Sequence, residues 1–374
     1  MDTATRLELL TRNTQEVLLE DDLKQMIEAG IKLKHYIGFE ISGQVHLGTG
    51  LMSGMKIADL QKAGVDCSIF LATWHAWMND KLGGDLETIR KSAEYFAENM
   101  KASLKVMGGD PEKLRVVNAD DQYHHNDEYW LKVVDIAKQM TLARAMRSIT
   151  IMGRKEGEDL SIAKLLYPAM QVADIFDQGA NIAHAGMDQR KAHVIAREVA
   201  LKVRGRFTHN KKDYKPVAIH HPLILGLQKP PVWPIPKEKQ QEILSEMKMS
   251  KSVKGSAVYV NDEPDVIRQK LKDAFCPANE ADGNPVLDWA KKLVFHKEKA
   301  VLDIKRPVKF GGDTSYESYE KLASDFISGK VHPMDLKSAM GEKLVVMLEP
   351  ARKMLSTSKM KKLKEQIDQV QITR

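Results

Sequence analysis

The sequence is poor in cysteine and contains no long apolar run. Its two cysteines among 374 residues, Cys67 and Cys276, lie in unrelated segments without the paired spacing of a metal knuckle or redox motif. This argues against disulfides and structural zinc, so we expect two reduced thiols. No apolar stretch approaches the roughly 20 residues that span a bilayer, and residues 1–6 lack the features of a targeting signal. We therefore expect a cytoplasmic protein without a membrane segment.

The excess of positive charge is also small. The chain has 57 basic and 51 acidic residues, a formal net charge of +6, and is 43% hydrophobic. This composition is typical of a soluble globular protein with two or three domains. The charge is compatible with a nucleic-acid partner but does not establish one. Runs such as Lys211-Lys212 and residues 359–364 are equally typical of a solvated surface.

Short apolar stretches alternate with longer amphipathic ones from residue 36 to about 222. The alternation predicts an α/β domain with a Rossmann-like, doubly wound parallel sheet, whose ligands bind beyond the carboxyl ends of the strands. The expected strands are 36–40, 67–72, 115–117, 181–185 and 217–220, and the expected helices are 51–63, 86–107, 128–153, 162–176 and 190–203.

A proline-rich segment at 228–236 can form neither a helix nor an inner strand and indicates a boundary or surface insertion. After Ser256 the pattern changes to one of helices. We expect a catalytic domain at 1–244 with a helical insertion near 120–160, a mobile connector at 245–258, and a mostly helical C-terminal domain at 259–374. The helices expected in the last domain are 264–274, 285–294, 316–328 and 333–355.

Two segments have the chemistry of phosphate binding. His46 and Gly48 follow the strand at 36–40 and precede a helix, where free amides and the helix dipole favour an anion. Alternatively, the glycines around His46 would serve only a tight chain reversal. The peptide Lys248-Met249-Ser250-Lys251-Ser252 places two lysines in a short loop that could hold a leaving polyphosphate, although solvated basic loops are common.

A polar stripe follows the helix expected at 162–176. Tyr167, Gln171, Asp174 and Gln178 recur at helical spacing, while the residues between them are apolar. Such a stripe either faces water or points into an enclosed space where its groups need partners.

Taken together, these motifs resemble those of class I aminoacyl-tRNA synthetases, and the substrate segments resemble those of tyrosyl-tRNA synthetases. The signature pair is His46-x-Gly48 with Lys248 to Ser252, although Thr49 replaces the usual last histidine. Nearly the whole chain shares the resemblance, which is greatest for the archaeal and eukaryotic branch. The matching segments are Tyr36-x-Gly38-Phe39, Tyr167-x-x-x-Gln171-x-x-Asp174, Gly186 to Lys191, Lys309 to Asp313 and His332 to Lys337.

The resemblance implies a tyrosine site. Tyr36 and Asp174 would bind the phenol hydroxyl, a group that both donates and accepts, so that phenylalanine would leave both residues unpaired. Tyr167, Gln171 and Gln189 would receive the ammonium group. Gln122 aligns poorly and is not assigned. The adjacent His124-His125 pair suggests a metal, but the sequence favours a wet loop because no further ligand at metal spacing accompanies it.

The resemblance also implies that ATP is a substrate. Gly38, His46, Gly48, Gly186 and Asp188 would contact ATP together with residues 248–252, and His46, Lys248 and Lys251 would act in catalysis. Asp188 would alternatively cap a helix. We expect Mg²⁺ to be held mainly by ATP, with no metal site on the protein.

For tRNA(Tyr), the resemblance points to Phe310 and His332 stacking on the first anticodon base and Asp335 reading it. Alternatively Phe310 is a core residue, or Asp335 caps its helix. The acceptor end would meet Arg147, Arg190 and Lys191. Members of the family are homodimers, with the helix near 128–153 close to the interface.

Two rival functions remain open. A tryptophanyl-tRNA synthetase has the same fold and signatures, but the indole has no acceptor for Tyr36. A catalytically silent RNA-binding relative would need neither the Lys248 to Ser252 loop nor the substrate stripe.

Overall fold

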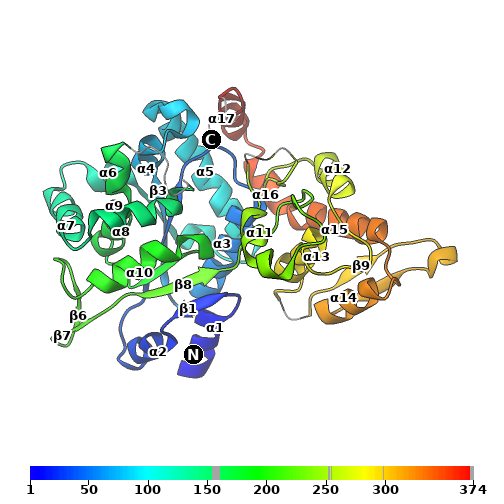
Figure 1. Cartoon of the computed structure of the whole chain (residues 1–374), viewed down its shortest axis with the longest axis horizontal. Coiled ribbons are helices and arrows are strands. Elements are labelled where there is room, and N and C mark those ends of the chain that lie inside the picture. The colour runs from blue at the N-terminus through cyan, green and yellow to red at the C-terminus, as the bar shows by residue number, and fades with distance from the viewer. Residues whose placement is uncertain (154–160, 252, 254, 298, 371–374) are drawn as a thin grey trace. The chain divides into compact units, whose positions relative to one another are not determined.

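The chain folds into two compact units in the computed structural model, which describes residues 1–153, 161–251, 253, 255–297 and 299–370 (Figure 1). Unit 1 contains Met1–Gln44, Ser53–Pro222 and the stretch that begins at Ser358. Unit 2 contains Val45–Met52 and Leu223–Thr357.

Unit 1 is built on a six-stranded sheet with the order β1-β8-β5-β2-β3-β4. Only β1 runs antiparallel to its neighbour. The five parallel strands are those expected from the sequence. Strands β3 and β8 are buried along nearly their whole length, as helices on both faces of the sheet require, whereas the edge strand β4 is mostly half-buried (Figure 1). Strand order reverses between β2 and β5, which makes their carboxyl ends the expected ligand site. The strands are β1 (Glu16–Leu18), β2 (Lys34–Glu40), β3 (Asp66–Ala72), β4 (Leu114–Asn118), β5 (Ile182–Gly186) and β8 (Val217–His221).

One helix expected in this unit is two helices. The expected segment 128–153 breaks because α7 ends at Lys138 and Thr141 begins α8, where its side chain accepts a hydrogen bond from the Arg144 amide at 3.2 Å. A small hairpin, β6 (Phe207–His209) with β7 (Lys212–Tyr214), was not expected. The helices are α1 (Thr3–Thr11), α2 (Glu20–Glu28), α3 (Leu47–Lys62), α4 (Thr73–Met78), α5 (Leu86–Val106), α6 (Ala119–Tyr123), α7 (Asp127–Lys138), α8 (Leu142–Ser148), α9 (Ile162–Asp177) and α10 (Arg190–Val199).

Unit 2 is mostly helical, as expected. Trp289 is fully buried at its centre and donates through Nε1 to the Leu225 carbonyl at 2.7 Å. The expected helix 285–294 continues past Trp289 as a π-helix, and the expected helix 333–355 divides at Leu348. The elements are α11 (Gln240–Glu246), α12 (Pro264–Asp273), α13 (Pro285–Trp289), β9 (Leu302–Ile304), β10 (Thr314–Tyr316), α14 (Tyr319–Ile327), α15 (Pro333–Met347) and α16 (Glu349–Leu355).

The two units do not divide the chain at the expected boundaries. Residues 45–52 join unit 2 because the Leu47 amide donates to Val258 O at 2.9 Å and the Val260 amide donates to Val45 O at 3.0 Å. The segment from Leu223, expected in the first domain, also joins unit 2. Conversely α17 (Ser358–Asp368) returns to unit 1, where it packs on α5 and Asp368 Oδ1 accepts from Gln44 Nε2 at 2.6 Å. Sequence patterns do not reveal such long-range pairings.

No helix in the described part of the chain is both long and apolar enough to cross a membrane.

Candidate active site

Asp174 lies at the centre of a buried polar cluster in unit 1. Its side chain, on α9, is fully buried, and Oδ1 accepts hydrogen bonds from the hydroxyls of Tyr123 at 2.9 Å and Tyr129 at 3.0 Å. Gln122 Nε2 lies 3.3 Å from the same oxygen. Burial raises the pKa of Asp174 well above its usual range, although the two tyrosine hydrogen bonds oppose that rise. One oxygen of the carboxylate is therefore held by protein donors.

The second oxygen of Asp174 is different. Oδ2 is buried and makes no hydrogen bond with any residue that the structure describes. The ring of His75 lies 3.8 Å away, and burial lowers the pKa of that histidine to about 3, so it is neutral near pH 7. A buried acceptor without a partner costs about 1–3 kcal/mol. A ligand that donates a hydrogen bond here would relieve that cost.

Tyr36 supplies a donor near this carboxylate. Burial, with the charge of Asp174, raises the pKa of Tyr36 well above its usual range, so the phenol stays protonated. Its hydroxyl makes no hydrogen bond to the described residues. The side chain folds back along β2, and a Cβ on Gly38 would lie 2.4 Å from the Tyr36 hydroxyl. Gly38, which we expected to contact ATP, is thus required by the position of Tyr36.

An amide pair occupies the other end of the α9 stripe. Gln171 Nε2 donates to Gln189 Oε1 at 3.3 Å, and Gln189 Nε2 donates to the carbonyl of Ile151 at 3.0 Å. These bonds leave Gln171 Oε1 buried without a partner in the described structure. Tyr167 is buried and packs edge-on against His75 with ring centroids 4.4 Å apart. The open acceptor on Gln171 matches the needs of an ammonium group.

The stripe therefore does not face water. Asp174 and Tyr167 are buried, and Gln171 is half-buried. Gln178, at the end of the stripe, donates to Gln122 Oε1 at 2.9 Å and so joins the cluster around Asp174. The alternative of an ordinary helix with a wet face is wrong.

Gly186 and Asp188 follow strand β5. Gly186 precedes a 3-10 turn (Met187–Gln189), and the residue at the N-terminal cap of α10 is Gln189. Asp188 therefore does not cap α10, which contradicts the structural alternative for this residue. Asp188 is exposed, and its charge acts to raise the pKa of His221, which burial lowers to about 4.

The two signature segments lie together in unit 2. Met249 is buried, and its sulfur accepts from the Gly48 amide at 3.4 Å, while the Met249 amide donates to the Ile224 carbonyl at 2.8 Å. A Cβ on Gly48 would lie 3.1 Å from Nδ1 of His46, so the ring of His46 needs a glycine there. The methionine thus anchors a loop in which Lys248, Ser250 and Lys251 are half-buried. Ser252 lies outside the described residues.

His46 is a neutral donor. Burial lowers its pKa to about 3, and the positive charges of Lys251 and Lys248 act in the same direction. The Thr49 amide donates to Nδ1 at 3.2 Å, which places the ring proton on Nε2, 3.3 Å from the Thr49 hydroxyl. Threonine in place of the usual histidine therefore contacts the His46 ring.

Two of the three basic residues predicted for the acceptor end meet at one place. The Lys191 ammonium donates to the Arg147 carbonyl at 3.2 Å and to the Thr150 hydroxyl at 3.0 Å. Arg190, the next residue on α10, is held by Glu16 of β1, with Nε 2.8 Å from Oε2. Arg147 is exposed.

The predicted anticodon residues belong to unit 2. Phe310 ends a 3-10 turn (Val308–Phe310) and is 61% exposed, so the core alternative is wrong. His332 caps α15, its Nδ1 accepting from the Met334 amide at 3.2 Å. Asp335 therefore does not occupy the cap position, and its carboxylate makes no hydrogen bond or ion pair with the described residues. The capping alternative for Asp335 is wrong as well.

Sequence reasoning missed the residues that hold Asp174. Gln122, left unassigned, and Tyr123 lie on α6 directly after β4, so their place at the carboxyl end of a strand was a usable signal. No comparable signal in the sequence indicated that Tyr129, on α7, would contact Asp174. No three histidine, cysteine or acidic side chains gather as metal ligands in the described part of the chain, His124 and His125 included.

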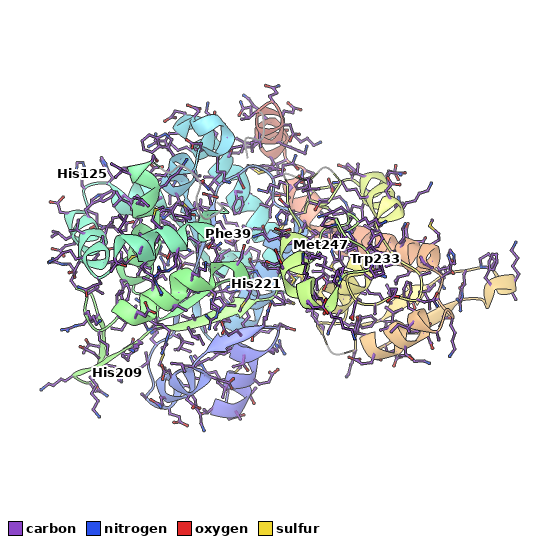
Figure 2. The ribbon with its side chains drawn as sticks, in the orientation of Figure 1. Phe39, His125, His209, His221, Trp233 and Met247 are labelled. Atoms are coloured by element: carbon purple, nitrogen blue, oxygen red, sulfur yellow. The ribbon has the colours of Figure 1, made fainter. Side chains whose placement is uncertain are left out.

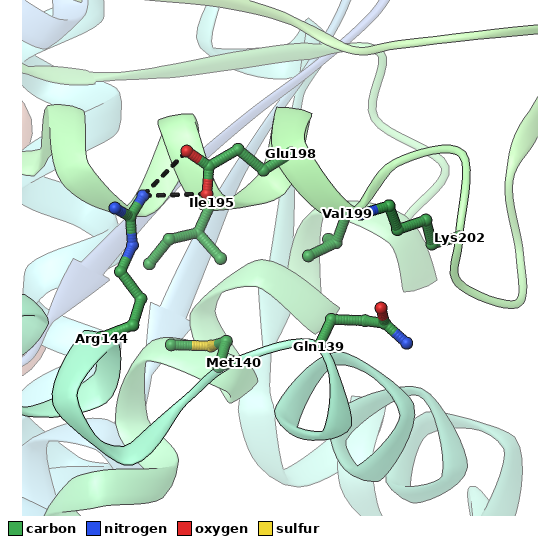
Figure 3. Close-up of a pocket in the computed structure, with 7 residues that line it drawn as sticks. All are labelled: Gln139, Met140, Arg144, Ile195, Glu198, Val199 and Lys202. Carbon is green, nitrogen blue, oxygen red and sulfur yellow. Dashed lines mark hydrogen bonds and ion pairs between the residues drawn. The ribbon is translucent and has the colours of Figure 1, made fainter.

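A separate hollow of about 280 Å³ lies in unit 1, where the turn between α7 and α8 meets α10 (Figure 3). Arg144 bridges one side with Nη2 2.9 Å from Glu198 Oε2. None of the predicted site residues lines it. The lining residues are Gln139, Met140, Arg144, Ile195, Glu198, Val199 and Lys202.

Known proteins are similar to this chain over nearly its whole length. The family model of class I tRNA synthetases (W and Y) matches residues 29–349. The tyrosine–tRNA ligase of Thermococcus sibiricus is 58% identical over 356 residues, covering 94% of this chain and 95% of that protein. The crystal structure of tyrosyl-tRNA synthetase complexed with L-tyrosine from Pyrococcus horikoshii is 53% identical, with a TM-score of 0.95 and coverage of 99% and 100%. That of the Aeropyrum pernix enzyme is 38% identical, with a TM-score of 0.80 and coverage of 98% and 99%.

The chain therefore belongs to the class I aminoacyl-tRNA synthetases of the tryptophan and tyrosine family, and it is an enzyme. Within that family its place is among the tyrosine–tRNA ligases.

Proposed function

We propose that the chain activates tyrosine with ATP and transfers it to the 3′ end of tRNA(Tyr). The observation that carries this proposal is the one-sided environment of Asp174. Protein donors occupy Oδ1, while Oδ2 is buried and open. A phenol hydroxyl would donate to Oδ2 and accept from Tyr36, so both groups of the pocket would be satisfied.

The same arrangement separates tyrosine from its nearest rivals. Phenylalanine has no hydroxyl and would leave the buried Asp174 oxygen without a partner, at a cost of about 1–3 kcal/mol. The indole of tryptophan has one donor and no acceptor for Tyr36. At the other end of the substrate, the Gln171 carbonyl oxygen and the Tyr167 hydroxyl would receive the ammonium group.

In the first reaction, the tyrosine carboxylate attacks the α-phosphorus of ATP and the bond to the leaving pyrophosphate breaks. No side chain acts as a nucleophile, so catalysis depends on positioning and on stabilising the phosphate charge. Lys248 and Lys251 would stabilise the departing pyrophosphate as cations, whereas neutral His46 would donate one hydrogen bond through Nε2. Asp188 would accept from the ribose.

Magnesium would be carried by ATP. Mg²⁺ prefers phosphate oxygens, keeps several waters, and neutralises part of the polyphosphate charge when bound. The residues that approach the phosphates in this proposal are cations, amides and hydroxyls, which suits a metal held by the nucleotide rather than by the chain.

In the second reaction, a terminal ribose hydroxyl of tRNA attacks the activated carbonyl and AMP leaves. Arg147, Arg190 and Lys191 would approach the acceptor end. In unit 2, exposed Phe310 and His332 would stack on the first anticodon base, and Asp335 would accept from the N1–H and amino group of guanine. The aminoacylated tRNA is a substrate of translation, so we propose that the enzyme acts in the cytoplasm.

We further propose that the chain acts as a homodimer through α7 and α8. These helices carry large apolar side chains that are exposed: Leu131 at 44%, Val134 at 56% and Leu142 at 68%. A second copy of the chain would remove this apolar surface from water.

ATP–pyrophosphate exchange with each amino acid in turn tests the function. We expect exchange with tyrosine and very little with phenylalanine or tryptophan. Exchange with tryptophan alone would identify the tryptophan enzyme. No exchange with any amino acid, together with retained tRNA binding, would identify a silent RNA-binding relative.

A further inference from the structure

The β6–β7 hairpin of unit 1 contains none of the residues assigned to the tyrosine site. Its strands pair Phe207 with Tyr214 and His209 with Lys212. The two residues between the strands, Asn210 and Lys211, have φ of 49° and 64°. Two successive left-handed residues make the tight turn that suits a two-residue hairpin. The tip therefore has a defined shape.

The base of the hairpin is fixed to the body of unit 1. The ring of Phe207 stacks on Phe176 of α9 with centroids 5.3 Å apart. The Tyr214 hydroxyl accepts a hydrogen bond from Asn181 Nδ2 at 3.3 Å. Beyond this anchor the strands extend away from the sheet, and Figure 2 shows His209 near the end of this projection.

The hairpin and the residues that flank it have an excess of positive charge. Residues 202–215 contain six basic residues and one acidic residue, a net charge of +5, whereas the entire chain carries +6. Like charges so close together repel one another, and this destabilises a folded surface unless a polyanion approaches it.

Only two of the six cations have acidic partners among the described residues. Arg204 lies 3.6 Å from Glu128 and 4.0 Å from Asp135, and Arg206 lies 3.3 Å from Asp213. The other four cations are exposed and form no ion pair within the described structure: Lys202, Lys211, Lys212 and Lys215.

We propose that the β6–β7 hairpin is a contact surface for the phosphate backbone of the bound tRNA, an interaction independent of base sequence. The inference rests on the proposed function, because that function supplies the polyanion. Lysines act as flexible point charges and suit a regularly charged backbone, whereas reading base edges favours arginine or amide groups. Residues 208–213 contain no large apolar side chain, so the tip lacks the group with which a membrane-binding segment would insert.

The test is equilibrium binding of the full-length enzyme to tRNA(Tyr) over a series of salt concentrations. The test variant combines Lys211→Ala, Lys212→Ala and Lys215→Ala. A charge-preserving variant replaces the same three lysines by arginine. The matched control combines Lys24→Ala, Lys62→Ala and Lys105→Ala, which are exposed lysines on α2, α3 and α5 without ion pairs in the described structure.

We expect the alanine variant to raise the dissociation constant about tenfold and to reduce the slope of log affinity against log salt by about 2–3, roughly one per lost phosphate contact. A tRNA of another sequence should lose affinity by the same factor, because phosphate contacts carry no sequence information. The arginine variant and the matched control should bind nearly as the wild type does. Tyrosine-dependent pyrophosphate exchange should not change.

Unchanged affinity and slope in the alanine variant, or an equal loss in the matched control, would overturn the hairpin proposal. So would a variant that loses binding to anionic vesicles while keeping its affinity for tRNA. Failure of the proposed function would look different, since the wild type itself would then fail to exchange pyrophosphate with tyrosine.

Discussion

The hydroxyl of Tyr123 donates to Oδ1 of Asp174 across 2.9 Å, and Oδ2 of the same carboxylate is buried and accepts no hydrogen bond within the described structure. Together with Tyr129, Tyr123 limits the orientations open to Asp174. The carboxylate is thus oriented before any ligand binds, which would lower the cost of ordering if a substrate hydroxyl binds here as we propose.

Removing these donors should change the pH dependence of tyrosine activation. In Tyr123→Phe or Tyr129→Phe, a hydrogen bond that lowers the pKa of Asp174 is lost, so the pKa rises further. Asp174 then becomes protonated at a higher pH, and activity should fail earlier as the pH decreases. The measurement is kcat/KM for tyrosine in pyrophosphate exchange from mildly alkaline to mildly acidic pH. Tyr316→Phe, which removes a similar hydroxyl contact to Asp325 in unit 2, is the control.

Asp174→Asn should lower kcat/KM for tyrosine by roughly ten- to a hundredfold, because a hydrogen bond to a charged acceptor contributes about 1.5–3 kcal/mol. The fold should survive, since asparagine preserves the volume. Asp177→Asn is the matched control: Asp177 lies on the same helix and pairs with Lys132 at 2.6 Å. An unchanged exchange rate with tyrosine would contradict the phenol assignment.

Lys248→Ala or Lys251→Ala should slow adenylate formation by about 10²–10³ while tyrosine affinity changes little, because these lysines are proposed to act on the departing pyrophosphate. Pre-steady-state measurement of tyrosyl-adenylate formation checks this. Lys239→Ala, at an exposed lysine of unit 2, should behave as the wild type. Adenylate formation at the wild-type rate in both variants would remove the loop from the mechanism.

The protein should lose stability as the pH falls below about 6.5. Burial lowers the pKa of His35 and His75 to about 3 and that of His221 to about 4. Between these values and the pKa of an exposed histidine, these side chains are protonated in the unfolded chain but neutral in the folded one. Each such histidine contributes a slope of about 1.4 kcal/mol per pH unit between its unfolded and folded pKa. The raised pKa of Asp174 has the opposite effect and favours the folded state as the pH falls, but it is a single group, whereas several histidines act against it. Urea unfolding over a pH series measures the slope, and a flat profile between about pH 7 and 5 would be inconsistent with buried neutral histidines.

Asp335→Ala should reduce tyrosylation of tRNA with G in the first anticodon position and leave pyrophosphate exchange intact. Because His332 rather than Asp335 caps α15, the melting temperature should not change. Aminoacylation of tRNAs that differ only at that base, alongside thermal unfolding, checks both expectations. Asp265→Ala, in the first turn of α12, is the control. Equal base preference in variant and wild type would show that Asp335 does not read the anticodon.

The parallel strands could be predicted because each is a short apolar run bounded by turns, a local pattern. The α9 stripe could be predicted because helical spacing fixes which residues share a face. Tyr129 could not, because it lies 45 residues from Asp174 and nothing local marks the contact. Tyr123, 51 residues from Asp174, had only its place directly after β4 as a signal. The break between α7 and α8 had a local signal, because Thr141 is a typical helix-capping residue. The continuous apolar pattern of 128–153 nevertheless led to the prediction of a single helix.

Helix α17 follows the whole of the second stretch of unit 2 in the chain, yet it packs on α5 of unit 1. During synthesis, unit 1 is therefore begun first and completed last. Domains fold as units while the chain emerges from the ribosome. Helix α17 can therefore pack on α5 only after residues 223–357 have been synthesised. A nascent chain arrested before Ser358 would expose the surface of α5 that α17 covers, even if its tyrosine pocket had already formed.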